Sequence, residues 1–221
     1  MRIDLHVHLQ PYSRSSDFPL EAYAAAIEKA RLPVATVTDY GTVDGVVALE
    51  KRLGGVLIVY GVELTTHEGQ FLVYSSDRKF LQTLPPRLRT LDHLPRTKET
   101  AVIWAHPRVP WQNGWRAPFQ SKPLTKFIFR RVDGVEFFNG AMMAMGKRGG
   151  VEPHYHDILR QQVEKWGVAA VGGSACQTEA GFLSAWTTFP ALRNSQDFIT
   201  AIKDRAVKPG AAMERAMLAV V

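Results

Sequence analysis

The sequence contains one cysteine and has no long apolar segment. Cys176 is alone among 221 residues, which excludes a disulfide framework within the chain and a zinc site built from several thiolates. No segment approaches the roughly 18 uncharged apolar residues that span a bilayer. The N-terminal MRIDLHVHLQ lacks the apolar core of a secretion signal. We therefore expect a cytoplasmic protein without a membrane span.

Blocks of like charge are absent as well. The chain has 27 Lys and Arg against 21 Asp and Glu, a net charge of +6, yet no run of five or more basic residues. A dispersed basic excess fits two readings equally: an anionic partner such as a small phosphorylated substrate, or an ordinary soluble surface. No recognised nucleic-acid module is present, so we expect nucleic acid only as a substrate.

Short apolar runs rich in β-branched residues recur along the chain and alternate with segments of helical character. Such runs are typical of strands buried on both faces, and the alternation predicts a single α/β domain over residues 1–221 with a parallel sheet or barrel. The predicted strands cover 34–38, 56–60, 101–105, 134–138 and 168–172; the predicted helices cover 19–31, 43–53, 153–166 and 195–205, with Ser195 as N-cap of the last. We expect one or two outer helices in 77–99 and a loop near the site in 111–122.

Polar residues with metal-binding chemistry follow several of these strands. The first predicted strand ends in Asp4-Leu5-His6-Val7-His8. Side chains two apart on a strand share a face, so two imidazoles can converge on one metal; alternatively they are two polar residues at a strand end. Because active groups gather at the carboxyl ends of parallel strands, the other candidates extend this set: Asp39, Tyr40, Glu63, His106, Glu136 and Asn139.

In order and spacing these motifs resemble the PHP (polymerase and histidinol phosphatase) family over nearly the whole chain. The family's motifs D-L-H-x-H, S-D, T-D-H-x-T, G-x-E, A-H-P and G-S-D-A-H correspond to residues 4–8, 16–17, 38–42, 61–63, 105–107 and 173–177. The resemblance implies a distorted (β/α)7 barrel, a TIM-like α/β fold. It also implies hydrolysis of phosphate esters with two or three ions of zinc, manganese or iron.

A set of ligands follows from the resemblance. His6, His8 and Glu63 would hold a first metal, Glu63 would bridge to a second metal held by His106, and Asp17 would belong to a third site. Two close cations activate a water and clamp the oxygens of a phosphate. Arg108, directly after His106-Pro107, is the candidate for binding the phosphate, because its guanidinium fork matches phosphate oxygens.

Three positions depart from the family pattern. The histidine of T-D-H-x-T is Tyr40, and the aspartate and histidine of G-S-D-A-H are Ala175 and Gln177. Alanine has no ligand atom and a glutamine amide is a poor ligand for a zinc-like ion. We therefore expect one or two divalent ions, with the third site lost.

The remaining candidates have ordinary structural readings. His67, His93, His154 and His156 are expected to be surface or core histidines. Arg116, Lys147 and Arg148 are weaker phosphate candidates or surface charges. Asp17 also suits a helix cap, Asp39 suits a loop held by backbone hydrogen bonds, and Cys176 suits a small buried position.

Three functional readings remain open at this stage. The first is a metal-dependent phosphoesterase that uses a metal-bound water on a small phosphate monoester or nucleotide. The second is a degenerate member that binds a metal or anion without catalysis, as a sensor or partner subunit, with a mononuclear hydrolase of non-phosphate chemistry as a variant. The third is a barrel without metal. Metal content separates them, since two or more ions favour phosphoester hydrolysis.

Overall fold

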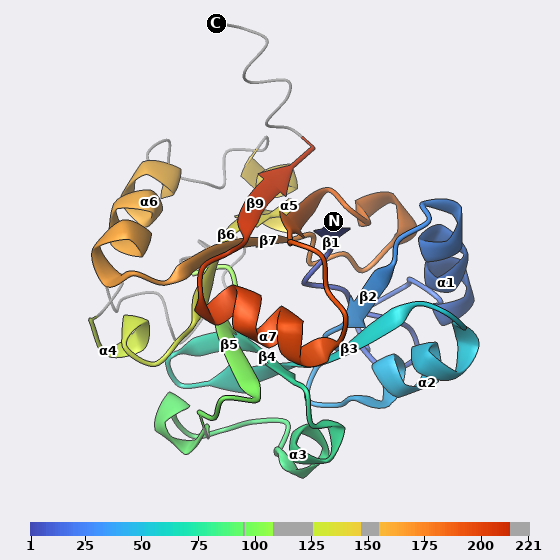
Figure 1. The fold of residues 1–221 in the computed structure, drawn as a ribbon, viewed down its shortest axis with the longest axis horizontal. Helices are drawn as coiled ribbons and strands as arrows, with labels where there is room; N and C mark the ends of the chain where they lie inside the picture. The colour runs from blue at the N-terminus through green and yellow to red at the C-terminus, as the bar shows by residue number, and fades with distance from the viewer. Residues whose placement is uncertain (95, 108–125, 147–154, 213–221) are drawn as a thin grey trace, which may run out of the picture.

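The computed structural model of the chain describes residues 1–94, 96–107, 126–146 and 155–212. Strands and helices alternate through most of its length (Figure 1). In order they are β1 (Arg2–Ile3), α1 (Leu20–Lys29), β2 (Val34–Val37), α2 (Asp44–Arg52), β3 (Leu57–Thr66), β4 (Gly69–Ser75), α3 (Arg78–Thr83), the 3-10 helix η1 (Leu91–His93), β5 (Thr100–Trp104), α4 (Lys126–Phe129), β6 (Gly134–Asn139), α5 (Gly140–Gly146), α6 (Tyr155–Trp166), β7 (Ala169–Gly173), the 3-10 helix η2 (Glu179–Gly181), β8 (Ala185–Thr188), α7 (Ser195–Lys203) and β9 (Lys208–Ala211).

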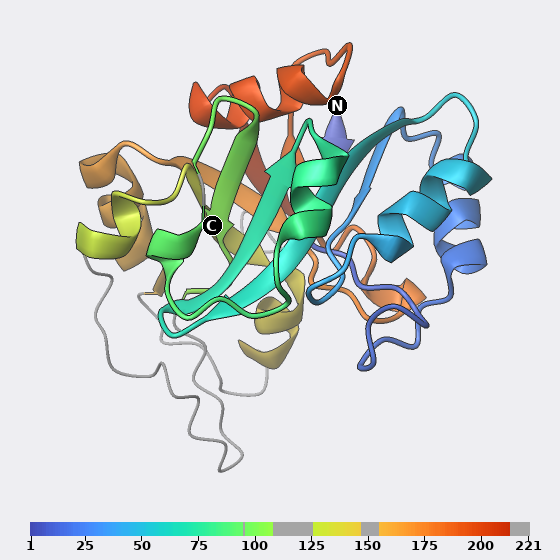
Figure 2. The ribbon, with the colours of Figure 1, turned by 90° about the horizontal axis from the view of Figure 1, so that it is seen from below.

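The main sheet has six strands in the order β2-β3-β4-β5-β6-β7 and curls into a half-barrel (Figure 2). Strands β2 and β3, β5 and β6, and β6 and β7 pair in parallel, and β4 is antiparallel to both of its neighbours. The reversal arises because Thr66 of β3 pairs with Gly69 of β4, which leaves only two residues for the connection, too few for a parallel crossover. The five predicted strands and the α/β class are confirmed, but a closed barrel of seven parallel strands is not.

The first strand is shorter than the sequence predicts. Strand β1 ends at Ile3 and pairs with β8 in a second, three-stranded antiparallel sheet. Beyond it, the buried Asp4 carboxylate accepts hydrogen bonds from the backbone N–H groups of His6 (3.2 Å), Ser174 (2.8 Å) and Leu183 (3.0 Å). Asp4 therefore bends the chain away from a regular ladder at the residue where the strand was expected to continue.

Residues 5–8 lie between the two edges of the half-barrel. The N–H of Thr38, just after β2, donates to the carbonyl of Val7 at 2.9 Å, and the N–H of His8 donates to the carbonyl of Cys176, after β7, at 3.1 Å. These few hydrogen bonds bring His6 and His8 to the carboxyl ends of strands that are far apart in the sequence.

The inside of the curled sheet is apolar at one end and polar at the other. Helix α7 packs against β3, β4 and β5 (Figure 1), where Phe198 and Ile202 join a buried cluster with Val59. Because side chains two apart share a face, Val59 and Glu63 both point inward from β3. The apolar cluster under α7 thus supports a polar layer at the carboxyl ends of the strands.

The other helices cover the outside. Helices α1 and α2 lie on one flank, and α4 and α6 lie on the opposite flank (Figures 1 and 2). The four predicted helices are confirmed as α1, α2, α6 and α7, and the polar segment 77–99 forms α3 and η1. The predicted cap of α7 is wrong by one residue: the side chain of Asn194, not Ser195, accepts from the N–H of Asp197. The predicted loop 111–122 lies outside the described residues. Within the described part of the chain, no helix has the length and apolarity of a membrane span.

Candidate metal centre

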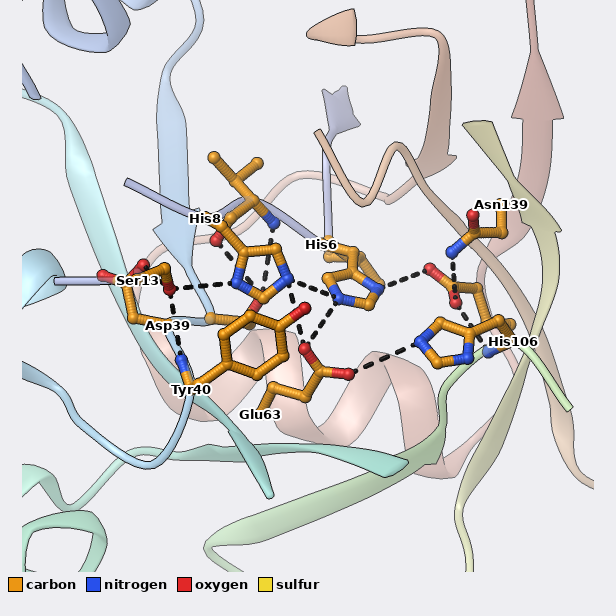
Figure 3. Close-up of polar contacts among 12 residues, drawn as sticks. His6, His8, Ser13, Asp39, Tyr40, Glu63, His106 and Asn139 are labelled. Atoms are coloured by element: carbon orange, nitrogen blue, oxygen red, sulfur yellow. Dashed lines mark hydrogen bonds and ion pairs between the residues drawn. The ribbon is translucent and has the colours of Figure 1, made fainter. Parts of the chain in front are cut away.

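Four of the predicted metal ligands point toward one another at the carboxyl ends of the strands (Figure 3). His6 and His8 come from the segment after β1, Glu63 from β3, and His106 from the residues after β5. His6, His8 and Glu63 are buried, and the side chain of His106 is 19% exposed. The cluster therefore has one side open to solvent, next to His106.

Three of these side chains meet at one point. The Nε2 atoms of His6 and His8 are 3.0 Å apart. The Oε2 atom of Glu63 lies 3.2 Å from Nε2 of His6 and 3.1 Å from Nε2 of His8. Whether these three atoms are joined by hydrogen bonds or face one another as acceptors depends on which ring nitrogens of His6 and His8 carry protons.

The tautomer of His6 is set by Glu136. Nδ1 of His6 lies 3.0 Å from Oε1 of Glu136, and a carboxylate oxygen accepts hydrogen bonds. Nδ1 therefore carries a proton, and Nε2 is left with its lone pair directed at Glu63. A carboxylate that holds the far nitrogen in this way orients an imidazole and makes it a better metal ligand.

The tautomer of His8 is set by Ser13 and Asp39. The hydroxyl of Ser13 donates its only proton to Oδ1 of Asp39 at 2.7 Å. It therefore accepts in its contact with Nδ1 of His8 at 3.2 Å, so Nδ1 of His8 is the protonated nitrogen. Asp39 also accepts from the N–H of Leu9 at 2.7 Å, which confirms the expectation that Asp39 holds a loop by backbone hydrogen bonds.

These hydrogen bonds leave three acceptor atoms facing one another. The lone pairs of the two Nε2 atoms and the Oε2 carboxylate oxygen of Glu63 would repel each other unless a positive charge lay between them. Ligand atoms around a zinc-type ion, with bonds of about 2.0–2.2 Å, lie about 3–3.5 Å apart. The observed spacing of 3.0–3.2 Å and the imidazole and carboxylate donors both fit a divalent cation.

The second oxygen of Glu63 faces a different direction. Oε1 is buried and has no hydrogen-bond partner among the described residues, while Nε2 of His106 lies 3.5 Å from it. One ligand atom from each of His6, Glu63 and His106 lies within 4.8 Å of the others. Glu63 thus offers one oxygen to His6 and His8 and the other to the side of His106.

The backbone at His106 is held in a strained conformation. Its φ is +26°, in the left-handed region that side chains seldom adopt. Its N–H donates to Oε2 of Glu136 at 2.8 Å, and the Asn139 amide donates to the same oxygen at 2.8 Å. Strain of this kind persists where the surroundings fix it, commonly at functional sites. Glu136 therefore positions both His6 and His106.

The electrostatics of the cluster favour a positive charge at its centre. Burial opposes a charge on His6, but Glu136 and Glu63 outweigh it and raise the pKa of His6 to about 10. Burial alone would raise the pKa of Glu63, yet the charge of His6 and the three neighbouring imidazoles hold it well below its usual range. Burial lowers the pKa of His8. The same environment that favours a proton on Nε2 of His6 favours a cation there.

Tyr40, Ala175 and Gln177 are the three positions where the sequence departs from the motifs that it resembles. The ring of Tyr40 stacks on His8, with ring centroids 4.2 Å apart. Ala175 adopts a left-handed backbone with φ +50°. The side chain of Gln177 lies near the Tyr40 hydroxyl. None of these three side chains is an imidazole or a carboxylate.

Several predicted residues are not brought into the cluster. Asp17 is exposed, and its N–H donates to the carbonyl of Gln177 at 2.9 Å; its role as a ligand stays a prediction. Arg108, Arg116, Lys147, Arg148 and His154 lie outside the described residues. The remaining histidines lie away from the site: His67 at the β3–β4 turn, His93 in η1, and His156 against Phe137 and Phe138. Cys176 is buried, which raises the pKa of its thiol well above the usual range, so the expectation of a small buried residue is confirmed.

Sequence reasoning left the roles of Glu136 and Asn139 open and missed Ser13. The motif spacing that indicated the candidate ligands gives no signal for Ser13, which lies in an irregular loop and contacts His8. Glu136 lies 130 residues from His6, and its position on β6 alone did not distinguish a pocket residue from a strand end.

Comparisons with known proteins support the fold. The sequence matches no protein-family model and no curated protein. PsfC from Pseudomonas syringae PB-5123 matches with a TM-score of 0.70 at 19% identity, over 99% of this chain and 95% of PsfC. A two-domain protein from Bacteroides vulgatus ATCC 8482 that contains a predicted PHP-like metal-dependent phosphoesterase matches with a TM-score of 0.62 at 16% identity, over 96% of this chain and 64% of that protein.

A further match is a protein from Bifidobacterium adolescentis ATCC 15703, whose function as a metal-dependent phosphoesterase is also a prediction. Its TM-score is 0.53 at 13% identity, over 92% of this chain and 96% of that one. Identities this low show the fold and not the activity. The chain therefore has the fold that these three proteins share, with a His–Glu cluster that fits a divalent cation at the carboxyl ends of its strands.

Proposed function

We propose that this protein is a metal-dependent phosphoesterase that hydrolyses a small phosphate monoester or a nucleotide. The observation that carries the proposal is the convergence of the Nε2 lone pairs of His6 and His8 with Oε2 of Glu63 at 3.0–3.2 Å. The predicted phosphoesterase activity of two proteins with the same fold supports the choice of reaction. Zinc, manganese and iron all suit the imidazole and carboxylate donors.

The ligands divide into two groups around Glu63. His6, His8 and Oε2 of Glu63 would hold one ion, and His106 with Oε1 of Glu63 would hold a second. Bound cations supply a water of lowered pKa and a clamp for phosphate oxygens. Glu136 and Ser13 keep the Nδ1 protons of the two histidines away from the centre, so both rings present lone pairs without rearrangement.

The phosphate needs a positive partner at the open side of the cluster. Arg108 is two residues after His106, the one partly exposed member of the group. Its guanidinium is proposed to bind two phosphate oxygens, as its planar fork allows. The partial exposure of His106 agrees with substrate entry on that side.

A second candidate function is binding of one ion without turnover. The observation that favours it is the loss of expected metal ligands at two positions. Tyr40, which stacks on His8, stands where a histidine is expected, and Ala175, which has no ligand atom, stands where an aspartate is expected. The four remaining ligands are sufficient to hold one ion. The protein would then act as a sensor or as a partner subunit. The two candidates differ in turnover on phosphate esters.

The test is release of inorganic phosphate by protein loaded with zinc, manganese or iron(II), on p-nitrophenyl phosphate and ribose 5-phosphate. We expect turnover by the native chain and its loss in Glu63→Gln, while His93→Ala, an exposed histidine outside the cluster, keeps native rates. Arg108→Ala is expected to raise KM by about 10-fold or more, because a charge-assisted contact contributes about 1.5–3 kcal/mol. A metal-loaded protein that releases no phosphate from either ester contradicts the phosphoesterase proposal and leaves the binding function.

A further inference from the structure

Tyr40 is the exposed aromatic ring that borders the metal centre. It is 40% exposed, and with Phe127 it makes up the exposed large hydrophobic side chains of the described residues. Its ring lies on His8 with centroids 4.2 Å apart and an angle of 16° between the planes (Figure 3). The part of the ring that His8 does not cover is an exposed aromatic surface next to the cluster.

Tyr40 is held at its backbone and on one face of its ring. Its N–H donates to the Ser13 hydroxyl at 3.3 Å, and its backbone pairs with Glu63 in an isolated parallel bridge. The side chains of Ser15 and Gln177 lie near its hydroxyl. Since His8 covers one face of the ring, the exposed area belongs to the opposite face and its rim. A ring fixed in advance loses little conformational entropy when it binds a ligand.

We propose that the open face of Tyr40 binds the base of a nucleoside monophosphate whose phosphate lies at the metal centre. The inference rests on the proposed function and narrows its substrate class. A flat aromatic face favours stacking with another planar ring. Ser15 and Gln177 at its rim offer a hydroxyl and an amide to the polar edge of a base, which a hydrocarbon ring lacks.

Stacking on Tyr40 predicts that the protein binds a ligand with a base more tightly than the same ligand without one. Stacking of one base on an aromatic side chain contributes about 5- to 150-fold in affinity. The probes are adenosine 5′-phosphonate and ribose 5-phosphonate, which resist hydrolysis and differ only in the base, titrated into zinc-loaded protein by calorimetry. We expect the adenosine compound to bind at least about 5-fold more tightly.

Two variants locate the preference at the ring. Tyr40→Leu keeps an apolar side chain and removes the flat face, so the ratio of the two affinities is expected to fall close to one. Tyr40→Phe keeps the face and is expected to keep most of the ratio. The zinc content of both variants, compared with that of the native chain, checks that His8 still holds the metal. In the native protein, the H2 and H8 resonances of the bound adenine should shift upfield in the ring current of Tyr40, a readout that requires no variant.

The outcomes separate this inference from the function on which it rests. A ratio close to one in the native protein, with ribose 5-phosphonate still bound, overturns the ring-binding site and leaves the phosphoesterase. A preference for adenosine 5′-phosphonate that is as large in the Tyr40→Leu variant as in the native protein also overturns the ring-binding site. Failure of both phosphonates to bind the metal-loaded protein overturns the phosphoesterase proposal together with the inference. An unshifted adenine spectrum on binding excludes stacking on Tyr40, whatever the variants show.

Discussion

Replacement of Glu136 by glutamine is expected to weaken metal binding without removing the fold. The two carboxylate oxygens serve three donors: Nδ1 of His6 at 3.0 Å on Oε1, and the N–H of His106 and the amide of Asn139, both at 2.8 Å, on Oε2. Glutamine has a single oxygen and an NH2 group that only donates. It satisfies the two donors at the Oε2 position when its NH2 faces His6. The opposite orientation would place NH2 against two donors in a buried site.

The favoured orientation reverses the tautomer of His6. Nδ1 must then accept from the glutamine NH2, and the proton moves to Nε2, the atom that faces His8 and Glu63. A protonated Nε2 has no lone pair for a cation. Loss of a residue that orients a metal ligand reduces metal affinity by about 10- to 100-fold, or about 1.4–2.7 kcal/mol, and we expect the Glu136→Gln variant in this range or above it.

Competition between the metal-free protein and a chromophoric chelator for zinc measures this loss. Glu164→Gln, at an exposed position on α6, is the matched control and should bind zinc as the native chain does. Long-range 15N–1H spectra of the imidazoles should show the proton of His6 on Nε2 in the Glu136→Gln variant. Native zinc affinity in that variant, or a His6 tautomer that does not change, would refute the reasoning.

Three further changes test other parts of the structure. Gly173→Ala places a Cβ 2.6 Å from Cβ of His6, so we expect a loss of about 1–3 kcal/mol in urea unfolding together with weaker zinc binding; unchanged unfolding would show that His6 moves freely. Phe198→Ala empties the cluster under α7 and should cost about 3–5 kcal/mol by the same measurement; a loss below 1 kcal/mol would contradict its place in the core. Burial lowers the pKa of His156, so its neutral form stabilises the fold above the unfolded pKa of about 6.5, and that contribution is lost as pH falls through the lower folded value. His156→Phe should therefore lose less unfolding free energy than the native chain between pH 7 and 5, and equal losses would contradict the assignment.

The strands could be predicted because their chemistry is local. Runs such as 134–138 and 168–172 are apolar and almost unbroken, which is what burial on both faces requires. The barrel could not be predicted closely, because the antiparallel β4 was not identified and nothing in the local sequence reports which strands pair. The end of β1 at Ile3 depends on hydrogen bonds from Ser174 and Leu183 to Asp4, residues that only the folded chain brings near.

The cluster of candidate ligands could be predicted from motif spacing, and its supporting residues could not. His6, His8, Glu63 and His106 follow strands or strand-like segments, where side chains of parallel folds converge. Ser13 and Glu136 act through hydrogen bonds to ligands, a role that depends on three-dimensional distance and leaves no pattern in the sequence. Tyr40 was identified as a departure from a motif, but its stacking on His8 and its exposure are visible only in the structure.

The most direct test of a hydrolytic metal centre is the metal content per chain. Protein purified without a histidine tag or chelator would be analysed by mass spectrometry, beside a His6→Ala, His106→Ala double variant. We predict two ions per native chain, held by the two groups of ligands that share Glu63, and their loss in the variant. One ion would favour binding without turnover. No ion, even after addition of zinc, manganese or iron, would contradict the central claim.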